Sequence, residues 1–570
     1  MTPEPVLDLS YAKKGKSAND NGSMLVASSS PMYESGNDLL GDEKMSPVML
    51  NKIFLVNNVC FPNQDTPYKP AINEIGWTPF HLKLFFLNGF GYAVDSMAAM
   101  LQGIIATQAF VEIGGGGYPT GLTMALYAGL LVGALFWGFG ADIIGRRMAF
   151  NITLLMAGAS TLVAGAMPNW GALGLFVALL GFGAGGNLIL DPAVFLEFLP
   201  FDKQWTITAM AAWWGLGQTL EGGIAWGFFS RDDWSCDTTT TTTPPEVCTW
   251  QNNKAWRLIM FTSGAIILTM SAARVLVVRL EETPKFLLSA GRDEELVANL
   301  QALATKYNRT CSLTTQQLEA CGHLNVESTA RKPHHKVGRQ FLSHLRGLFV
   351  TRKIAISTSL IWLSWAMIGM AYPLFFVFLP SVISSRIASD PPTFYETWRD
   401  YTIVNFCAIF GPLIAGWLAE IKILGRRYTM VIGAIVTMAL FFGYTAVSTA
   451  QQNLALSCTI CKSRHPTLLM LYHNMFKIIS KTTLSIAICI NVYYGTLYAY
   501  TAEVLPSAHR TTGNGIAVAA NRAMGLLSAV IAVVADTTTV TPLYICAALF
   551  FLLAVVSALL PFEPYGRRAS

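Results

Sequence analysis

Residues 138–147 read GFGADIIGRR, and residues 416–427 read GWLAEIKILGRR. Each string stands at the end of a long apolar segment, and each places an acidic residue and a glycine before two arginines. A second pair of strings follows in the same order, with EFLP at 197–200 and EVLP at 503–506. Two signatures that recur in one order indicate a duplicated, parallel repeat.

The composition around these repeats is that of a polytopic membrane protein. Of the 570 residues, 53% are hydrophobic and only 13% are charged, with a mean hydropathy of +0.44. A soluble domain carries about 25% charged residues. The net charge of +5 is small and spread over loops, which argues against nucleic-acid binding. We therefore expect a lipid bilayer and a small-molecule substrate as partners, and no nucleic acid.

Twelve apolar segments are long enough to cross the roughly 30 Å hydrocarbon core of a bilayer. They fall into two groups of six, which predicts an all-α membrane protein with two pseudo-symmetric six-helix bundles at 81–278 and 354–561. The segments lie near 82–108, 119–140, 149–167, 171–198, 206–229, 256–278, 354–380, 401–420, 428–449, 482–505, 513–536 and 541–561.

The basic residues predict the topology. The central stretch 279–353 carries twelve Lys or Arg residues, whereas the loop near 109–119 carries none. By the positive-inside rule, this stretch, the first 80 residues and the tail 562–570 are expected in the cytosol. The first 80 residues are polar, contain no signal-peptide hydrophobic region and are expected to be largely disordered. Cys236 and Cys248 flank a Thr-rich loop on the outer side, where a disulfide is expected.

The second repeat contains an anomaly. The motif glycine and the glutamate that follows it are 52 positions apart in the first repeat and 78 apart in the second. The excess lies at 461–490, and joining Ile460 to Asn491 restores one apolar segment. We hypothesise that these 30 residues are a recent insertion or an unspliced intron, and a transcript that contains all 30 codons would reject the intron.

The first apolar segment carries polar residues on one helical face. Asn88, Asp95 and Gln102 are spaced by sevens, and Tyr92 lies one turn before Asp95. A carboxylate inside the bilayer costs about 2.5–3.5 kcal/mol by insertion scales, so such a residue is expected to face a watery protein interior. Asp95 is interpreted either as a proton-loading residue or as a structural, hydrogen-bonded carboxylate.

Other polar residues in the apolar segments are candidates for lining a substrate cavity, although each is also compatible with helix packing. Arg522 is interpreted either as the counter-charge of Asp191 or Glu221, or as a group that holds a substrate carboxylate. Three acidic groups against one arginine favour a cationic or neutral substrate. Tyr494 and Tyr498 share a helix face and either stack on a ring-bearing substrate or pack. The cavity candidates are Asn88, Tyr92, Gln102, Asn187, Asp191, Trp214, Gln218, Glu221, Tyr494, Tyr498 and Arg522.

The repeated string resembles the signature of the major facilitator superfamily, and the resemblance covers the chain from about 80 to 565. The string GFGYAVDSMAAM at 89–100 looks like the first span of synaptic-vesicle-protein-related transporters. The runs EETPKF at 281–286 and LPFE at 560–563 resemble signatures of sugar porters and metabolite symporters. The whole set is similar to fungal transporters of this mixed type, and it implies the major facilitator fold.

The resemblance also implies a conformational latch at the cytosolic helix ends. Glycines let two helices approach closely, and the carboxylates and arginines then form a charge network. Glu197 and Glu503 are expected to pair with Arg146 and Arg426. The latch candidates are Gly138, Asp142, Gly145, Arg146, Arg147, Glu197, Gly416, Glu420, Gly425, Arg426, Arg427 and Glu503.

These features predict a monomeric secondary active transporter that works by alternating access. The sequence contains no ATP-binding motif, metal-ligand spacing or catalytic constellation, so we expect a proton gradient as driving force and neither a cofactor, a metal nor enzyme activity. Direction stays open between nutrient import and export of a secondary metabolite, such as an amine. A non-transporting nutrient sensor is the other class, disfavoured because the chain ends about ten residues after its last segment. The plasma membrane is the expected location, with a vacuolar or vesicular membrane as alternatives.

Overall fold

The computed structural model consists of helices, and no strand occurs among the residues that it describes. The described residues are 52–53, 55–56, 70–114, 118–236, 248–277, 281–322, 345–386, 394–445, 486–506, 509–534 and 541–564. Within these ranges, the side chains of residues 142–144, 232, 289, 376–386, 444 and 532–534 are outside the description.

The first bundle contains six long helical segments, one of them broken near Ala211. Local sequence sets several of the helix starts. Pro79 is the first residue of α4, where its missing N–H would have had no helical partner. Asn169 caps α7, because its side chain accepts a hydrogen bond from the Ala172 backbone N–H at 2.8 Å. The segments are α4 (Pro79–Ile113), α5 (Gly121–Ile144), α6 (Arg146–Ala164), α7 (Trp170–Phe198), α8 (Trp205–Met210) with α9 (Ala212–Phe229), and α10 (Ala255–Val277).

The second bundle repeats this arrangement. Its segments are α15 (Arg352–Arg386), α16 (Phe394–Ala408) with α17 (Phe410–Ala419), α18 (Gly425–Tyr444), α21 (Ile486–Val504), α22 (Arg510–Val534) and α23 (Thr541–Ala558). Of the predicted insertion, 461–485 lies outside the described residues, while Ile486 to Ile490 form the first turn of α21. That turn packs against α17 within the second bundle, since a Cβ built on Gly411 would lie 2.5 Å from the Ile488 carbonyl oxygen.

Ten helical segments in the described part of the chain are long and apolar enough to cross a membrane. The two other predicted segments coincide with α8–α9 and α21, which carry polar residues such as Gln218, Glu221 and Asn491 in their interiors. The predicted grouping of segments into two sets of six is therefore confirmed. The polar residues inside α8–α9 and α21 lower the mean hydropathy of these two segments, so hydropathy is a weaker signal of a membrane span there.

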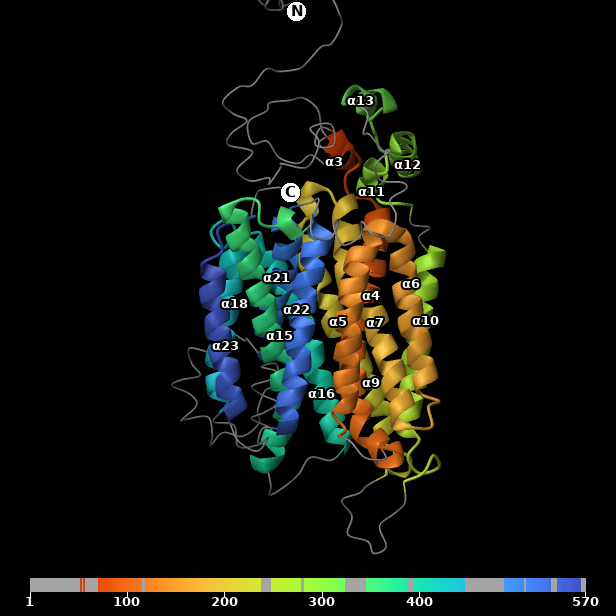
Figure 1. The fold of residues 1–570 in the computed structure, drawn as a ribbon, viewed down its shortest axis with the longest axis vertical. Coiled ribbons are helices and arrows are strands. Elements are labelled where there is room, and N and C mark those ends of the chain that lie inside the picture. The colour runs from red at the N-terminus through yellow and green to blue at the C-terminus, as the bar shows by residue number, and fades with distance from the viewer. Residues whose placement is uncertain are drawn as a thin grey trace, which may run out of the picture. The chain divides into compact units, whose positions relative to one another are not determined.

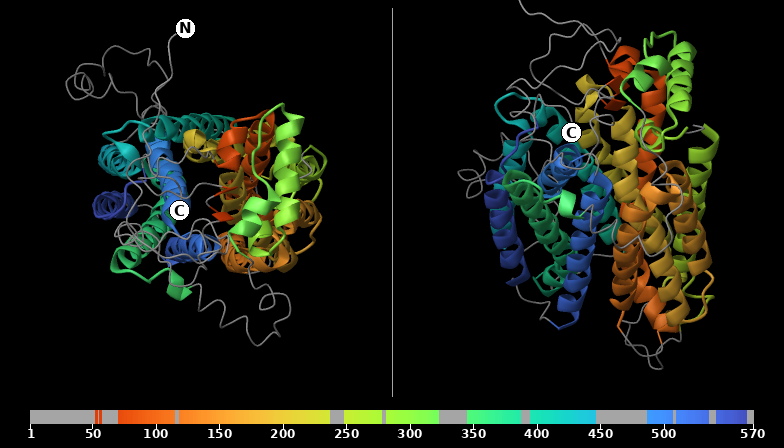
Figure 2. Two further views of the ribbon diagram at one scale, coloured as in Figure 1. Left: turned by 90° about the horizontal axis from the view of Figure 1, so that it is seen from above. Right: turned by 45° about the horizontal axis from the view of Figure 1, so that its top comes forward.

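The two bundles lie side by side, with α4–α10 forming one and α15–α23 the other (Figure 1). Viewed from above, the two groups of helices are again distinct (Figure 2). Between them α22 packs along α5, and α16 packs along α9. Glycine permits the close approach of α5 and α22, because a Cβ built on Gly138 of α5 would lie 3.1 Å from the Cα of Gly515 of α22.

The motif glycine of each repeat adopts a backbone conformation that other residues avoid. Gly145 has a φ of +102° and Gly425 a φ of +56°. In the second repeat, the Glu563 carboxylate accepts hydrogen bonds from the backbone N–H groups of Arg426 and Arg427, each at 3.0 Å. A carboxylate at this place compensates the unpaired N–H groups and positive dipole of the α18 N-terminus.

Glu282 occupies the matching place in the first repeat. A Cβ built on Gly145 would lie 3.2 Å from Glu282 Oε1, and the Glu282 carboxylate accepts a hydrogen bond from the backbone of Arg147. Burial raises the pKa of the Glu282 carboxyl, although the backbone bond and the charges of Arg147 and Arg292 oppose this rise. The sequence runs that resemble transporter signatures, at 281–286 and 560–563, thus each supply a carboxylate to a helix start.

A cluster of short helices covers one end of the first bundle (Figure 1). We call it the cap, and the membrane end on which it lies the cap end. An apolar core joins its helices and includes Ile72, Leu288, Leu300 and Leu318. The cap consists of α3 (Ala71–Ile75), α11 (Pro284–Ser289), α12 (Asp293–Lys306), α13 (Thr315–Ala320) and the described residues at 52–56.

The cap gives helical structure to part of the first 80 residues, expected to be largely disordered, and to part of the central loop 279–353. Most of residues 1–69 and residues 323–344 lie outside the described part of the chain. The described residues before α4 pack against the central stretch, where Lys52 forms a buried ion pair with Asp293. Apolar residues at 53, 56, 72 and 75 join the same core as the central helices. The physical reason is that neither segment buries its apolar side chains alone, whereas together they form a small core.

The predicted disulfide is present at the opposite end of the first bundle. Cys236 and Cys248 are bonded, with their Cα atoms 5.8 Å apart. Asn253 ties this loop to α4, because its side-chain amide donates to the Gln108 carbonyl at 2.8 Å and its side-chain oxygen accepts from the Cys236 N–H at 3.5 Å. The bond therefore anchors the segment between α9 and α10 to the end of α4.

Replacing both Cys236 and Cys248 by Ser is expected to lower the unfolding temperature of the purified protein. The bond closes a loop of 12 positions, and opening such a loop costs about 2–4 kcal/mol in the chain-entropy estimate. Thermal unfolding in detergent measures the effect. As control, a reductant is expected to lower the unfolding temperature of the parent and leave the double Ser variant unchanged. Equal stability of parent and variant would contradict the prediction.

Candidate functional site

A buried ion pair joins the two bundles. Asp95 of α4 and Arg522 of α22 are 0% and 3% exposed, and Arg522 Nη2 lies 2.8 Å from each Asp95 carboxylate oxygen. The indole Nε1–H of Trp214 on α9 donates to Asp95 Oδ2 at 3.0 Å. Asp95 thus faces protein on the side of the other bundle. Two charges taken out of water require such mutual contact, because desolvation is expensive for each of them.

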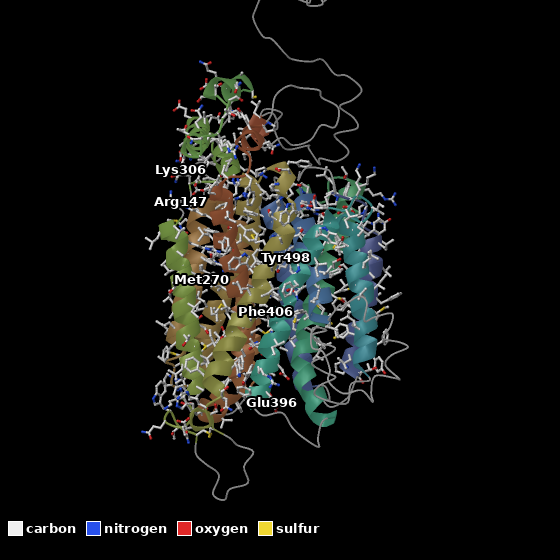
Figure 3. All side chains as sticks on the ribbon, turned by 180° about the vertical axis from the view of Figure 1, so that it is seen from behind. Arg147, Met270, Lys306, Glu396, Phe406 and Tyr498 are labelled. Atoms are coloured by element: carbon white, nitrogen blue, oxygen red, sulfur yellow. A yellow bond between two sulfur atoms is a disulfide. The ribbon has the colours of Figure 1, made fainter. Side chains whose placement is uncertain are left out.

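Aromatic side chains surround this pair. Trp214 stacks on Tyr494 with ring centroids 5.4 Å apart, and Tyr494 stacks on Tyr498 at 5.3 Å. Trp365 meets the edge of Tyr498 at 4.6 Å, and Tyr92 contacts Tyr498 at 5.4 Å. Figure 3 marks Tyr498 between the bundles, with Arg147 toward the cap end and Glu396 toward the opposite end. The residues come from α4, α9, α15 and α21, so both bundles contribute to one central cluster.

Two amide side chains hold this aromatic cluster in place. Gln218 Nε2 donates to the Tyr372 hydroxyl at 2.7 Å, across the bundle interface. Asn521 Nδ2 donates to the Tyr494 hydroxyl at 3.0 Å and to the Trp365 carbonyl at 3.1 Å. Buried polar groups fixed in this way specify the position of the rings they touch.

Several buried polar atoms near the pair have no hydrogen-bond partner among the described residues. They are both amide atoms of Asn88, the hydroxyls of Tyr92 and Tyr498, and Oε1 of Gln218. Asn88, Tyr92 and Asp95 share the α4 face that the sequence periodicity predicts. An unpaired buried polar group costs about 1–3 kcal/mol, so a site that keeps several is prepared for polar groups of a ligand or water.

Asp191 lies elsewhere and corrects a sequence interpretation. Its two carboxylate oxygens each lie 2.9 Å from Arg274 Nη2 of α10, and both residues are fully buried inside the first bundle. Arg274 also donates to the carbonyls of Leu87 and Phe150. Asp191 is therefore the counter-charge of Arg274 and not of Arg522, because its side chain points to the place where Arg274 also bonds the backbones of α4 and α6.

Three further candidates also turn into the first bundle. Asn187 accepts a hydrogen bond from Thr153 at 2.8 Å, and Gln102 accepts one from Thr123 at 2.7 Å. Glu221 is fully buried, and the Ser263 hydroxyl lies 2.9 and 3.0 Å from its two carboxylate oxygens. Neither Asp191 nor Glu221 is thus the partner of Arg522. The central cluster instead combines Tyr92, Asp95, Trp214, Gln218, Tyr494, Tyr498 and Arg522.

The predicted latch residues gather at the cap end of each bundle. Arg146 forms an ion pair with Glu197, and Arg426 pairs with Glu503 with Nη2 2.6 Å from Oε1. Both expected pairs are therefore present, and each lies within one bundle. Arg146 Nη2 also donates to the hydroxyl of Thr511 on α22 at 3.4 Å, which carries the first network across to the second bundle.

The remaining latch candidates have different surroundings. Arg427 Nη2 donates to the Ala558 carbonyl, and Arg147 is exposed. Gly416 faces α8, because a Cβ built on it would lie 3.5 Å from the Trp205 carbonyl oxygen. Glu420 is exposed at the end of α17. The side chain of Asp142 lies outside the described residues.

Sequence reasoning missed several residues of the site. Arg274 stands inside an apolar segment, and an arginine there is itself the signal of a buried partner. Asn521 directly precedes Arg522, and a polar amide inside an apolar segment was the available signal of a buried hydrogen-bond partner. Tyr372 and Trp365 carry no distinguishing pattern, because aromatic residues make up 12% of the chain. Within the described part of the chain, no three His, Cys, Asp or Glu residues are grouped as a metal site would require.

The comparisons with known proteins agree in one family. The profile of the Major Facilitator Superfamily matches residues 84–472. An uncharacterized MFS-type transporter of Schizosaccharomyces pombe is 35% identical over 94% of this chain and 92% of its own length. The MFS siderochrome iron transporter 1 of Ceriporiopsis subvermispora is 36% identical over 87% of this chain and 90% of its own length.

A solved structure has the same fold. The proton:xylose symporter XylE bound to 6-bromo-6-deoxy-D-glucose superposes with a TM-score of 0.61 and covers 86% of this chain and 98% of its own. The sequence identity is 13%, so this similarity concerns the fold alone.

A double-mutant cycle on the central pair tests its energetics. Asp95→Asn leaves Arg522 buried without its counter-charge, and a loss of about 3–5 kcal/mol of stability is expected. The double variant Asp95→Asn with Arg522→Gln is expected to regain most of this loss. Denaturant unfolding in detergent measures both. Asp202→Asn, at an exposed carboxylate, is the control and is expected to change stability by less than about 0.5 kcal/mol. A double variant no more stable than the single one would contradict the prediction.

Proposed function

The chain belongs to the major facilitator superfamily of membrane transporters, and from this premise we propose that it is a proton-coupled carrier of a small organic acid that bears a ring. The observation that carries the proposal is the contact of Asp95 with Arg522 across the two bundles. It supports an exchange in which a proton on Asp95 and a substrate carboxylate on Arg522 replace the ion pair together.

The chemistry of the exchange follows from charge balance. When Asp95 takes up a proton, it loses its negative charge, and Arg522 is left as a buried cation without a partner. A carboxylate from the substrate restores the balance, because it accepts two parallel N–H bonds from the guanidinium. When the substrate leaves, Arg522 attracts Asp95 again and favours release of the proton. The net load is one proton with one monocarboxylate, which is electrically neutral.

The distribution of charges supports an anion more than the sequence alone suggested. The preference for a cationic or neutral substrate counted Asp95, Asp191 and Glu221 against one arginine. Asp191 is neutralised by Arg274, and Glu221 is held by Ser263 within the first bundle. The central cluster therefore contains one acid and one base. An amine at this place would compete with Arg522 for Asp95 and leave the arginine unpaired.

The aromatic cluster supports a ring on the same substrate. Trp214, Tyr494 and Tyr498 present stacked faces beside Arg522, and such faces favour offset stacking with a planar ring. Polar atoms of Asn88, Tyr92 and Tyr498 are without partners among the described residues, and they suit a hydroxyl or ring nitrogen at the far side of the ligand. A compact molecule with a ring, one carboxylate and one further polar group fits this set.

Alternating access would use the contacts between bundles. Asp191–Arg274, Glu197–Arg146 and Glu503–Arg426 each lie within one bundle, so they favour movement of the bundles as rigid bodies. Asp95–Arg522 connects the bundles, so the state of this pair would bias their rocking. The Arg146–Thr511 contact at the cap end would break when that end opens.

Orientation and location belong to the same proposal. The central stretch 279–353 is rich in basic residues, which supports a cytosolic cap end by the positive-inside rule. The disulfide at the opposite end supports an oxidising outer compartment there. We place the monomer in the plasma membrane as an importer, with export, or a vacuolar or vesicular membrane, as the alternative arrangement.

The test uses purified protein in liposomes with an imposed pH gradient. Uptake of an aromatic monocarboxylate is expected when the outside is acidic. The binding affinity is expected to fall by up to about tenfold for each unit rise in pH, because one proton is taken up with the substrate. In Asp95→Asn, binding is expected to lose this pH dependence and gradient-driven accumulation to fall at least about tenfold, while substrate exchange at equal pH persists. Asp202→Asn serves as the matched control.

The substrate panel also contains an aromatic amine, a neutral sugar and an iron–siderophore complex, the last because the Ceriporiopsis relative is named a siderochrome iron transporter. Transport of the amine or sugar with no uptake of the acid would reject the proposed substrate class. Undiminished pH dependence in Asp95→Asn would remove Asp95 from the coupling. Accumulation of substrate in the liposomes when the inside, and not the outside, is acidic would identify export.

A further inference from the structure

The cap is fastened by an exposed serine in the turn between α12 and α13. The Glu74 carboxylate of α3 accepts two hydrogen bonds at one oxygen, from the backbone N–H and the side-chain hydroxyl of Ser312, each at 2.8 Å. Glu74 and Ser312 are 238 positions apart, so this contact ties the segment before α4 to the central stretch. The Ser312 hydroxyl attracts the Glu74 carboxylate because it donates a hydrogen bond to it. A negative charge added to Ser312 would turn this attraction into repulsion.

The surroundings of Ser312 suit an enzyme that modifies it. Ser312 and Arg309 are both exposed, and the residues between α12 and α13 are irregular. Arg309 stands three positions before the serine, where a guanidinium can dock in an acidic groove of a kinase. We propose that Ser312 is a phosphorylation site, and that the phosphate group releases α3 from the cap.

The modification is a phosphoryl transfer from ATP, catalysed by a serine/threonine protein kinase. The bond between the γ-phosphorus and the β–γ bridging oxygen of ATP breaks, and a bond from the Ser312 Oγ to that phosphorus forms. The hydroxyl proton passes to the base of the kinase, and ADP leaves. The product carries about −1.5 to −2 charges at pH 7 and has no hydroxyl proton to donate.

Electrostatics set the direction of the effect. Phosphorylation removes the donor that Glu74 accepts from and places a dianion against the same carboxylate. Like charges at hydrogen-bond distance repel strongly, and the turn is exposed, so the two groups separate. The Ser312 backbone N–H then also loses its acceptor. Because α3 has only five residues, it cannot keep its helix without such tertiary contacts.

Release of α3 would reach the transporting helices directly. Asn73 of α3 accepts a hydrogen bond from the Phe201 N–H at 3.0 Å, in the turn between α7 and α8. After α3 the chain passes Gly76 and enters α4, which carries Asp95. The α8 start that follows this turn contacts Gly416 of the second bundle. Phosphorylation of Ser312 is therefore a means of loosening the cap end where the bundles meet.

The experiment uses full-length protein in lipid nanodiscs, ATP and the catalytic subunit of cyclic-AMP-dependent protein kinase as the probe. Mass spectrometry is expected to find phosphate on Ser312, and Arg309→Ala is expected to slow the reaction at least about tenfold. Hydrogen exchange then reports on α3, because the Glu74 and Gly76 amides bond to the Pro70 and Ile72 carbonyls. Phosphorylation is expected to speed exchange of these amides at least about tenfold.

Charge reversal separates this mechanism from general loosening. In Glu74→Lys the contact is absent before modification, so α3 exchanges fast, and phosphate on Ser312 is expected to slow it by attracting Lys. Ser312→Ala is expected to carry no phosphate in this turn. Absence of phosphate on Ser312, unchanged exchange after phosphorylation, or faster exchange in the phosphorylated Glu74→Lys variant would each overturn the proposal. The inference is independent of the transported substrate, although modification in the cell requires the cytosolic cap end proposed above.

Discussion

The contact between Asp95 and Arg522 is the constraint on which the centre of this protein depends. Two charged side chains, one from each half of a duplicated chain, are buried where water cannot solvate them, and each is tolerable only because the other is present. Their attraction acts across the interface between the halves, and removal of either charge alters that attraction. In the proposed exchange, a proton neutralises Asp95 and a substrate carboxylate pairs with Arg522, so no net charge is left unpaired in the centre.

Three other buried ion pairs lie within single bundles. Asp191 with Arg274, Glu197 with Arg146, and Glu503 with Arg426 all connect helices of the same bundle. Such pairs stiffen a bundle, whereas the central pair couples one bundle to the other. Glu282 and Glu563 also act on one bundle each. Each carboxylate compensates a helix N-terminus beside a glycine of positive φ.

The cap links two segments that are separated along the chain by the whole first bundle. Its short helices contribute a small apolar core, a buried Lys52–Asp293 pair and the Glu74–Ser312 contact. Sequence reasoning treated the first segment as largely disordered and the central stretch as a loop. Three of the cap helices, α3, α11 and α13, have only five or six residues and leave hardly any periodic signal. Their order comes from burial against each other, which is visible only when the chain is folded.

The sequence by itself determined the repeat, the two sets of six segments, the disulfide, the latch pairs and the shared α4 face of Asn88, Tyr92 and Asp95, because hydrophobic length, motif spacing and helical periodicity are local properties. It did not determine the partners across interfaces. Arg522 lies 427 positions from Asp95, and periodicity gives the face of a helix but not the residue that meets it. The tertiary structure assigned Asp191 to Arg274 and Arg522 to Asp95, because burial permits a charge only where helix packing brings its counter-charge.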